Sequence, residues 1–135
     1  MRFDGYRTRE ERVQEFIDAC GGTTFEAVWN CLGEECLELQ EAAQDFHTIL
    51  DSNADDETKA KYRAAFVKEW ADVQYVLSQV ACFYNIDGEV AFNRVANNNM
   101  TKVIDGPDGS KKIQRREDGK ILKPEGYEKP DMRGL

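Results

Sequence analysis

With 135 residues, of which 41% are hydrophobic, the chain is long enough for one ordinary globular domain but not for two. The net charge of −8 comes from residues 1–99, which hold 9 basic and 19 acidic residues, whereas residues 100–135 hold 9 and 7. Such an acidic field repels nucleic acid polymers, and no apolar run is long enough for a membrane span or secretory signal. We therefore expect a soluble, cytoplasmic protein without a nucleic acid or membrane partner.

The first helix is predicted over residues 9–19. The sequence TREE places Thr8 as the N-cap of a capping box, in which a glutamate three residues later reaches back to the cap. Gly21 and Gly22 follow the apolar positions and end the helix.

The second and third helices are predicted to form a hairpin. In TTFE, Thr23 is expected to cap a helix that runs to about residue 47. The polar stretch DSNADDE is the expected loop, and the third helix is expected over about residues 57–84.

A fourth, shorter helix is expected from a cap at Asp87 to about residue 98. The segment 100–135 contains all three prolines and has no helical period, which predicts an extended basic tail with one short hairpin around DGK. The predicted fold is all-α: a four-helix bundle-like domain over residues 1–99 with an extended C-terminal tail over 100–135.

The cysteines show no CxxC pair, and a single histidine accompanies them, so zinc-site spacing is absent. We expect them to be reduced, small apolar residues. The four are Cys20, Cys31, Cys36 and Cys82.

Acidic residues interrupt the apolar stripes of helices two and three. At about 100° per residue, Glu35 lies about 60° from the stripe centred on Leu32, and Glu38 lies one step further on the same side. In helix three, Glu69 lies about 40° and Asp72 about 100° from the stripe centre. An antiparallel pair of helices would bring these four acids toward one point. Aromatic residues such as Trp29 and Trp70 are expected in the buried stripes.

Four converging carboxylates need neutralisation. At about 6 Å and an effective dielectric constant near 20, each pair costs about 3 kcal/mol and six pairs cost roughly 17 kcal/mol. This exceeds the typical stability of a small domain, about 5 to 15 kcal/mol. Helix two has no lysine or arginine, and Lys68 is expected to point elsewhere on its helix. An all-oxygen site of this kind suits Mg²⁺, with Mn²⁺ as a substitute.

A di-iron bundle is the closest competitor, but it requires Glu-x-x-His, and Gln44 occupies the position three before His47. A Mg²⁺ site held by a few carboxylates leaves positions for water and for phosphate oxygens. The favoured chemistry is therefore hydrolysis of a phosphoanhydride bond.

The segments GEECLELQEA and KEWADVQYVL, in this order and followed by REDGKILKPEGYEKPDM, resemble the MazG-like and phosphoribosyl-ATP pyrophosphatase-like family of all-α nucleoside triphosphate pyrophosphohydrolases. The resemblance covers nearly the whole chain. It implies Mg²⁺ ligands at Glu35, Glu38, Glu69 and Asp72. Glu34 resembles the family residue proposed to orient or deprotonate the attacking water, or to hold a further ion.

The resemblance also implies a substrate site for the phosphate chain. Asn99 and Lys102 match an Asn-x-x-Lys element, and Lys102 would place a mobile positive charge on a phosphate oxygen. Lys120 and Lys123 in DGKILK are weaker candidates that could reach the site of a neighbouring subunit through the tail.

The implied activity is cleavage of a nucleoside triphosphate, with dGTP the first candidate, to the monophosphate and pyrophosphate in a bacterial cytoplasm or that of a phage-infected host. The implied assembly is a homodimer or homotetramer in which two chains complete each site. Phosphoribosyl-ATP pyrophosphatase and dUTP hydrolase remain alternatives, as does a non-enzymatic helical interaction module whose acids recognise a basic partner.

Overall fold

The computed structural model describes residues 7–135, and in that range the protein is mostly helical, with four helices and one two-stranded hairpin. Helix α1 spans Arg9–Ala19. Its predicted capping box is confirmed: the Thr8 hydroxyl accepts a hydrogen bond from the Glu11 backbone, and the Glu11 carboxylate accepts one from the Thr8 backbone. Two backbone donors that the helix would leave unpaired are thereby satisfied.

Helices α2, Phe25–Leu50, and α3, Asp56–Phe83, form the predicted hairpin. The prediction that Thr23 caps α2 is wrong, because the hydroxyl of Thr24 accepts the hydrogen bond from the Ala27 backbone N–H at 3.2 Å. Both threonines have a side chain suited to the N-cap position, and the helix begins one residue later than expected. At the other side of the loop, Asp55 caps α3 through the Thr58 backbone.

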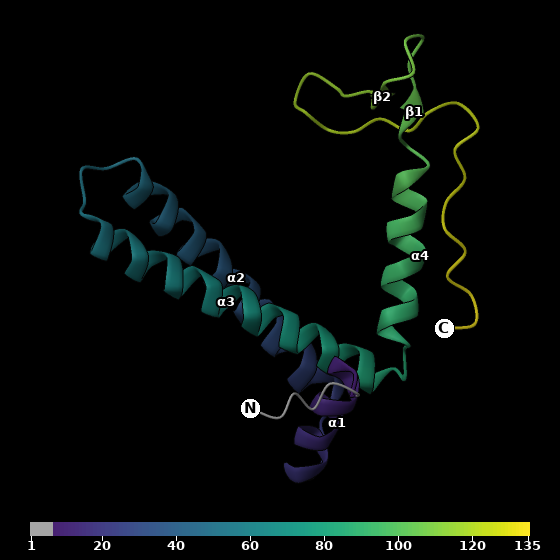
Figure 1. Ribbon diagram of the computed structural model, residues 1–135. Coiled ribbons are helices and arrows are strands. Elements are labelled where there is room, and N and C mark those ends of the chain that lie inside the picture. Colours follow the sequence, from purple (N-terminus) through teal and green to yellow (C-terminus); the bar gives the residue numbers. More distant parts are fainter. Residues whose placement is uncertain (1–6) are drawn as a thin grey trace. The chain divides into compact units, whose positions relative to one another are not determined.

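In Figure 1, α2 and α3 run antiparallel along each other, and α1 packs against α3 near its C-terminal end. This packing builds a small core. The buried residues of the described chain are Val13, Ile17, Val28, Val76, Ser78 and Ala81. They come from all three helices, and they place the core at the N-terminal end of α2 and the C-terminal end of α3, where α1 also packs.

Several residues expected in the buried stripes are exposed. Phe25 is 56% exposed, Trp29 41% and Trp70 50%. The expectation that these side chains lie in the core is therefore wrong for the single chain. The reason is that an α2–α3 hairpin with α1 on one side leaves other apolar faces of both long helices without a neighbouring helix.

The chain divides into two compact units, Met1–Ile86 and Asp87–Leu135, so α4 groups with the tail. Helix α4 spans Gly88–Met100, and its expected cap at Asp87 is confirmed by the hydrogen bond from the Val90 backbone. The strands β1, Ile104–Asp105, and β2, Lys111–Lys112, pair antiparallel. The expected turn at DGK is present as an isolated antiparallel bridge between Arg115 and Ile121.

The tail returns along α4, held by side chains of that helix. The Arg94 guanidinium donates to the carbonyl oxygens of Asp131 and Arg133, and the Asn98 amide donates to the carbonyl of Glu128 at 2.7 Å. The tail is thus extended, as expected, but fixed to the helix. Among residues 7–135, no helix is long and apolar enough to cross a membrane.

Candidate metal centre

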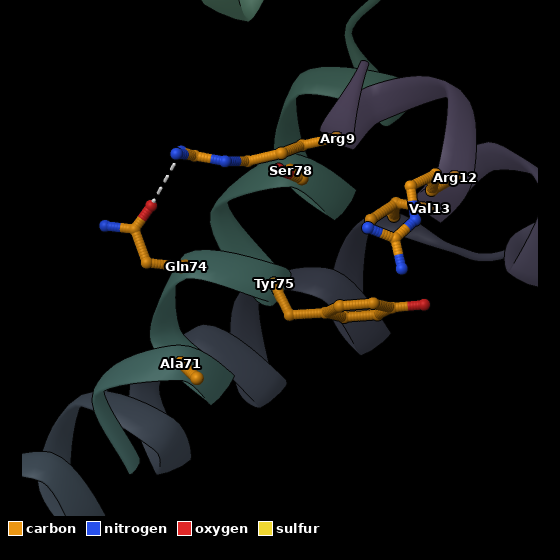
Figure 2. Close-up of a pocket in the computed structure, with 7 residues that line it drawn as sticks. All are labelled: Arg9, Arg12, Val13, Ala71, Gln74, Tyr75 and Ser78. Carbon is orange, nitrogen blue, oxygen red and sulfur yellow. Dashed lines mark hydrogen bonds between the residues drawn. The ribbon is translucent and has the colours of Figure 1, made fainter. Parts of the chain in front are cut away.

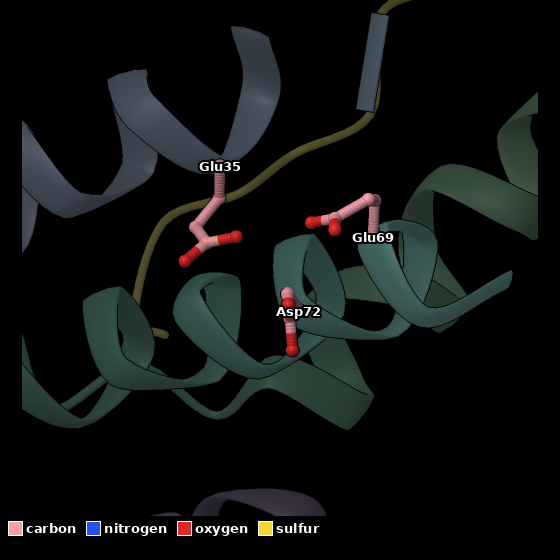
Figure 3. A group of neighbouring side chains, drawn as sticks. All are labelled: Glu35, Glu69 and Asp72. Atoms are coloured by element: carbon pink, nitrogen blue, oxygen red, sulfur yellow. The ribbon is translucent and has the colours of Figure 1, made fainter. Parts of the chain in front are cut away.

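Three carboxylates meet between α2 and α3. Glu35 comes from α2 and Glu69 and Asp72 from α3, and each offers an oxygen that lies within 4.8 Å of the oxygens of the other two (Figure 3). We call these three residues the carboxylate cluster. Their convergence follows from the sequence: the i,i+3 spacing of Glu69 and Asp72 puts both on one face of α3, opposite Glu35.

Two oxygens of the cluster, Oε2 of Glu35 and Oε2 of Glu69, are buried and have no hydrogen-bond partner among residues 7–135. A buried polar atom without a partner costs about 1 to 3 kcal/mol, and more where the group is charged. Such orphaned acceptors are uncommon in folded proteins, so they point to a cation or proton as the missing partner.

Burial and neighbouring negative charges raise the pKa of the Glu35 carboxyl. Burial is the first cause, followed by repulsion from Glu38 and Asp72, while Lys68 acts in the opposite direction. The site therefore disfavours the ionised form of Glu35 when no cation is bound.

Lys68 takes part in the site, and the expectation that it points elsewhere is wrong. Its ammonium lies 2.6 Å from Oδ2 of Asp72 and 3.4 Å from Oε1 of Glu69. The hydrogen bond to Asp72 raises the pKa of Lys68. The long side chain bends along α3 to its i+4 neighbour, which helical angle alone does not reveal. One ammonium against three ionised carboxylates still leaves two negative charges, which a divalent cation would balance.

The remaining acids predicted for the site lie at its edge. Glu38 is exposed on the next turn of α2 and outside the group of three, yet it is the strongest charge acting on Glu35. Glu34 is exposed as well. The Glu38 side chain makes no hydrogen bond or ion pair in the described chain. It would therefore be free to turn from the solvent side toward a divalent cation bound at the cluster.

Cys31 lies one turn before Glu35 and faces the same region. Burial raises the pKa of its thiol, and repulsion by Glu35 and Glu34 adds to the effect. The thiol therefore stays protonated at neutral pH while no metal ion is bound, and sulfur is in any case a poor ligand for Mg²⁺. All four cysteines are free, as expected.

A second group of predicted residues meets in the other unit. The ammonium groups of Lys102 and Lys123 lie 5.6 and 5.3 Å from the centroid of the Tyr127 ring. Lys102 also donates to Oδ1 of Asn99 at 2.8 Å. Two cations at one aromatic ring repel each other, so this arrangement favours an anion between or beside them.

Lys120 is not part of this group in the described chain; it lies exposed in the turn bridged by Arg115 and Ile121. Tyr127 was missed from the sequence. Its hydroxyl donates to Oδ1 of Asn98 at 2.6 Å, which fixes the ring near both lysines. The only available signal was an aromatic residue within the lysine-rich tail.

Comparison with models of protein families gave no match to this chain, and comparison with curated proteins gave none either.

Proposed function

We propose that this protein is a Mg²⁺-dependent nucleoside triphosphate pyrophosphohydrolase that cleaves a (d)NTP, with dGTP as the first candidate, to (d)NMP and pyrophosphate. The carboxylate cluster carries the proposal. Three acidic oxygens within 4.8 Å of one another, two carboxylate oxygens buried without partners and one nearby ammonium match the requirements of a hard divalent cation.

In the proposed enzyme, Glu35, Glu69 and Asp72 hold the cation, and Glu38 is the fourth ligand. Mg²⁺, when bound, supplies charge neutralisation for phosphate oxygens and lowers the pKa of a coordinated water. Glu34, exposed beside the cluster, is the proposed residue that orients or deprotonates the attacking water. Mn²⁺ would substitute because it accepts the same oxygen ligands.

The resemblance of the two acidic segments to MazG-like pyrophosphohydrolases gives the reaction class. A metal ion at the carboxylate cluster is compatible with many phosphoryl-transfer reactions, so the residues of the tail are needed to support a nucleoside triphosphate as the substrate. Lys102 and Lys123 at the Tyr127 ring, with Asn99 bonded to Lys102, form an anion-binding group suited to a phosphate chain. Lys120 is proposed to reach the substrate of a neighbouring subunit.

The proposed assembly is a homodimer or homotetramer that completes a four-helix bundle from two chains. Large apolar side chains exposed on α2 and α3 support it, since an isolated small domain rarely leaves so many uncovered. They include Leu37 at 56%, Trp70 at 50%, Leu77 at 46% and Val67 at 41%. A second copy burying these faces would add the core that one chain lacks.

The test is pyrophosphate release with Mg²⁺ and each nucleoside triphosphate in turn, including dUTP, together with phosphoribosyl-ATP. We expect release from dGTP, and a loss of at least about 100-fold in Asp72→Asn and Glu38→Gln, equal to about 2.7 kcal/mol in the barrier. Asp45→Asn is the matched control, because Asp45 is an exposed α2 carboxylate outside the cluster.

The same assay separates the alternatives. Pyrophosphate release from phosphoribosyl-ATP alone, or from dUTP alone, would identify that compound as the substrate in place of dGTP. The proposed metal centre would stand in either case. No release from any of these compounds, with the fold intact by circular dichroism, would reject the enzyme and favour a helical module whose acids recognise a basic partner.

A further inference from the structure

A pocket between α1 and α3 lies outside the carboxylate cluster. Its volume is about 290 Å³, and Figure 2 shows its lining side chains, which come from the first two turns of α1 and from one face of α3. This volume is near the lower end for small-molecule sites, about 300 Å³. None of the described residues that line it is acidic, although the chain carries a net charge of −8.

The charges of α1 are divided between two sides of the helix. Arg9 and Arg12, three residues apart and so on one face, line the α1–α3 pocket. Glu10 and Glu11 line a different hollow, together with residues from the C-terminal end of α3. The pocket is thus a positive site on an acidic molecule.

Neither arginine forms an ion pair with an acidic residue within residues 7–135. Arg9 donates to Oε1 of Gln74 at 3.2 Å, a neutral partner that holds the guanidinium at the pocket edge. The guanidinium of Arg12 makes no ion pair or hydrogen bond with any other residue in the described part of the chain. Guanidinium groups bind phosphate oxygens through paired N–H donors, so two arginines without an acidic partner in the described chain suit a phosphate group.

The inner wall offers one more polar group. Ser78 is only 5% exposed and lines the pocket, and its hydroxyl makes no hydrogen bond within residues 7–135. The Ser78 oxygen is not among the fully buried, unpartnered side-chain atoms of residues 7–135, so it stays accessible from the pocket. A ligand oxygen in the pocket would supply a hydrogen-bond partner.

The rest of the lining is apolar and aromatic. Val13 and Ala71 contribute methyl groups, and the Tyr75 ring lies along one side of the pocket (Figure 2). The Tyr75 ring is held by an edge contact with Phe16, with centroids 5.9 Å apart and an interplanar angle of 77°. Such a surface accepts a flat ring by stacking or edge contact.

We propose that the α1–α3 pocket binds a small organic phosphate that carries a flat ring, such as a mononucleotide. Arg9 and Arg12 bind the phosphate group, Ser78 hydrogen-bonds an oxygen of the ligand, and the ring packs on Tyr75 beside Val13 and Ala71. All of these groups belong to the unit Met1–Ile86, so the site needs neither the tail nor a divalent cation.

The test is isothermal titration of the full chain in EDTA with deoxyguanosine 5′-monophosphate, inorganic phosphate and deoxyguanosine. We expect the monophosphate to bind at least 10-fold more tightly than either of the other two. Equal binding of monophosphate and phosphate would overturn the ring contact, and equal binding of monophosphate and nucleoside would overturn the arginine site. No binding of the monophosphate at millimolar concentration would overturn the proposal as well.

Variants locate the site. Arg12→Gln should weaken monophosphate binding at least about 10-fold, the loss expected for one charge-assisted pair, and Arg12→Lys should recover part of it. Arg63→Gln is the control, since Arg63 is exposed on α3 outside the pocket. Equal affinity in Arg12→Gln and wild type would overturn the assignment. Because the titration contains no divalent cation and measures no hydrolysis, its outcome is independent of the proposed catalytic function.

Discussion

At the scale of single residues, the most informative atoms are Oε2 of Glu35 and Oε2 of Glu69, which are buried without partners. Lys68 relieves part of the repulsion through Asp72 and Glu69, but its ammonium hydrogen-bonds those two residues and not Glu35. The strain that a cation would relieve is therefore concentrated at Glu35.

Replacing Glu35 with glutamine should stabilise the metal-free protein. The substitution keeps the shape and removes one buried charge, so we expect a gain of about 1 kcal/mol in the free energy of unfolding. The measurement is urea denaturation in EDTA at pH 7.5. Glu41→Gln, at an exposed position of the same helix, is the control and should change stability by less than about 0.5 kcal/mol. A loss of stability in Glu35→Gln would contradict this account of the cluster.

The pH dependence follows from the raised pKa of Glu35. An acid whose pKa is higher in the folded state binds more protons there, so its contribution to stability is present at low pH and is lost as pH rises through the ordinary glutamate pKa, about 4.3, and beyond. In EDTA, the stabilisation by Glu35→Gln should therefore be larger at pH 7.5 than at pH 4.5. The check is a pair of denaturation curves at each pH; an effect independent of pH would contradict the raised pKa.

At the scale of elements, the sequence predicted the helices well because their signals are local. Capping residues such as Thr8 and Asp87 act on backbone groups two or three positions away, and helical spacing alone placed Glu69 and Asp72 on one face of α3. The hairpin loop then brought Glu35 opposite them.

What the sequence could not predict depends on contacts between distant residues or on side-chain conformation. The Lys68 side chain has many rotamers, and only some of them bring its ammonium to Asp72. Tyr127 meets Lys102 only because the tail folds back along α4. The exposure of Trp70 depends on which helices cover α3, and no local sequence pattern encodes which faces of α3 are covered.

The attachment of the tail to α4 gives a prediction at this scale. Asn98→Ala removes the hydrogen bonds to the Glu128 carbonyl and the Tyr127 hydroxyl, so the segment 124–133 should lose protection. Hydrogen exchange followed by mass spectrometry measures this, and we expect exchange there to rise by about 10-fold, equal to about 1.4 kcal/mol. Asn97→Ala, at an exposed neighbouring position, is the control. Unchanged exchange in Asn98→Ala would show that other contacts hold the tail.

At the scale of the whole molecule, the small core and the exposed apolar side chains of α2 and α3 favour the proposed assembly. Trp70→Arg would place a charge on a face that a second copy should bury. We expect wild type to elute as a dimer or tetramer of the 15.4 kDa chain and Trp70→Arg to shift toward the monomer. Light scattering after gel filtration makes the measurement. Gln40→Arg introduces the same charge at an exposed polar position of α2 and should leave the mass unchanged; a monomeric wild type would contradict the assembly.

The central claim is that Glu35, Glu69 and Asp72 together bind a divalent cation, and calorimetric titration of the metal-free protein with Mn²⁺ tests it most directly. The account predicts saturable binding at a fixed stoichiometry per chain and its loss in Glu69→Gln, while Asp45→Asn binds as wild type does. The absence of saturable binding in the wild-type protein, or equal binding by Glu69→Gln, would contradict the account.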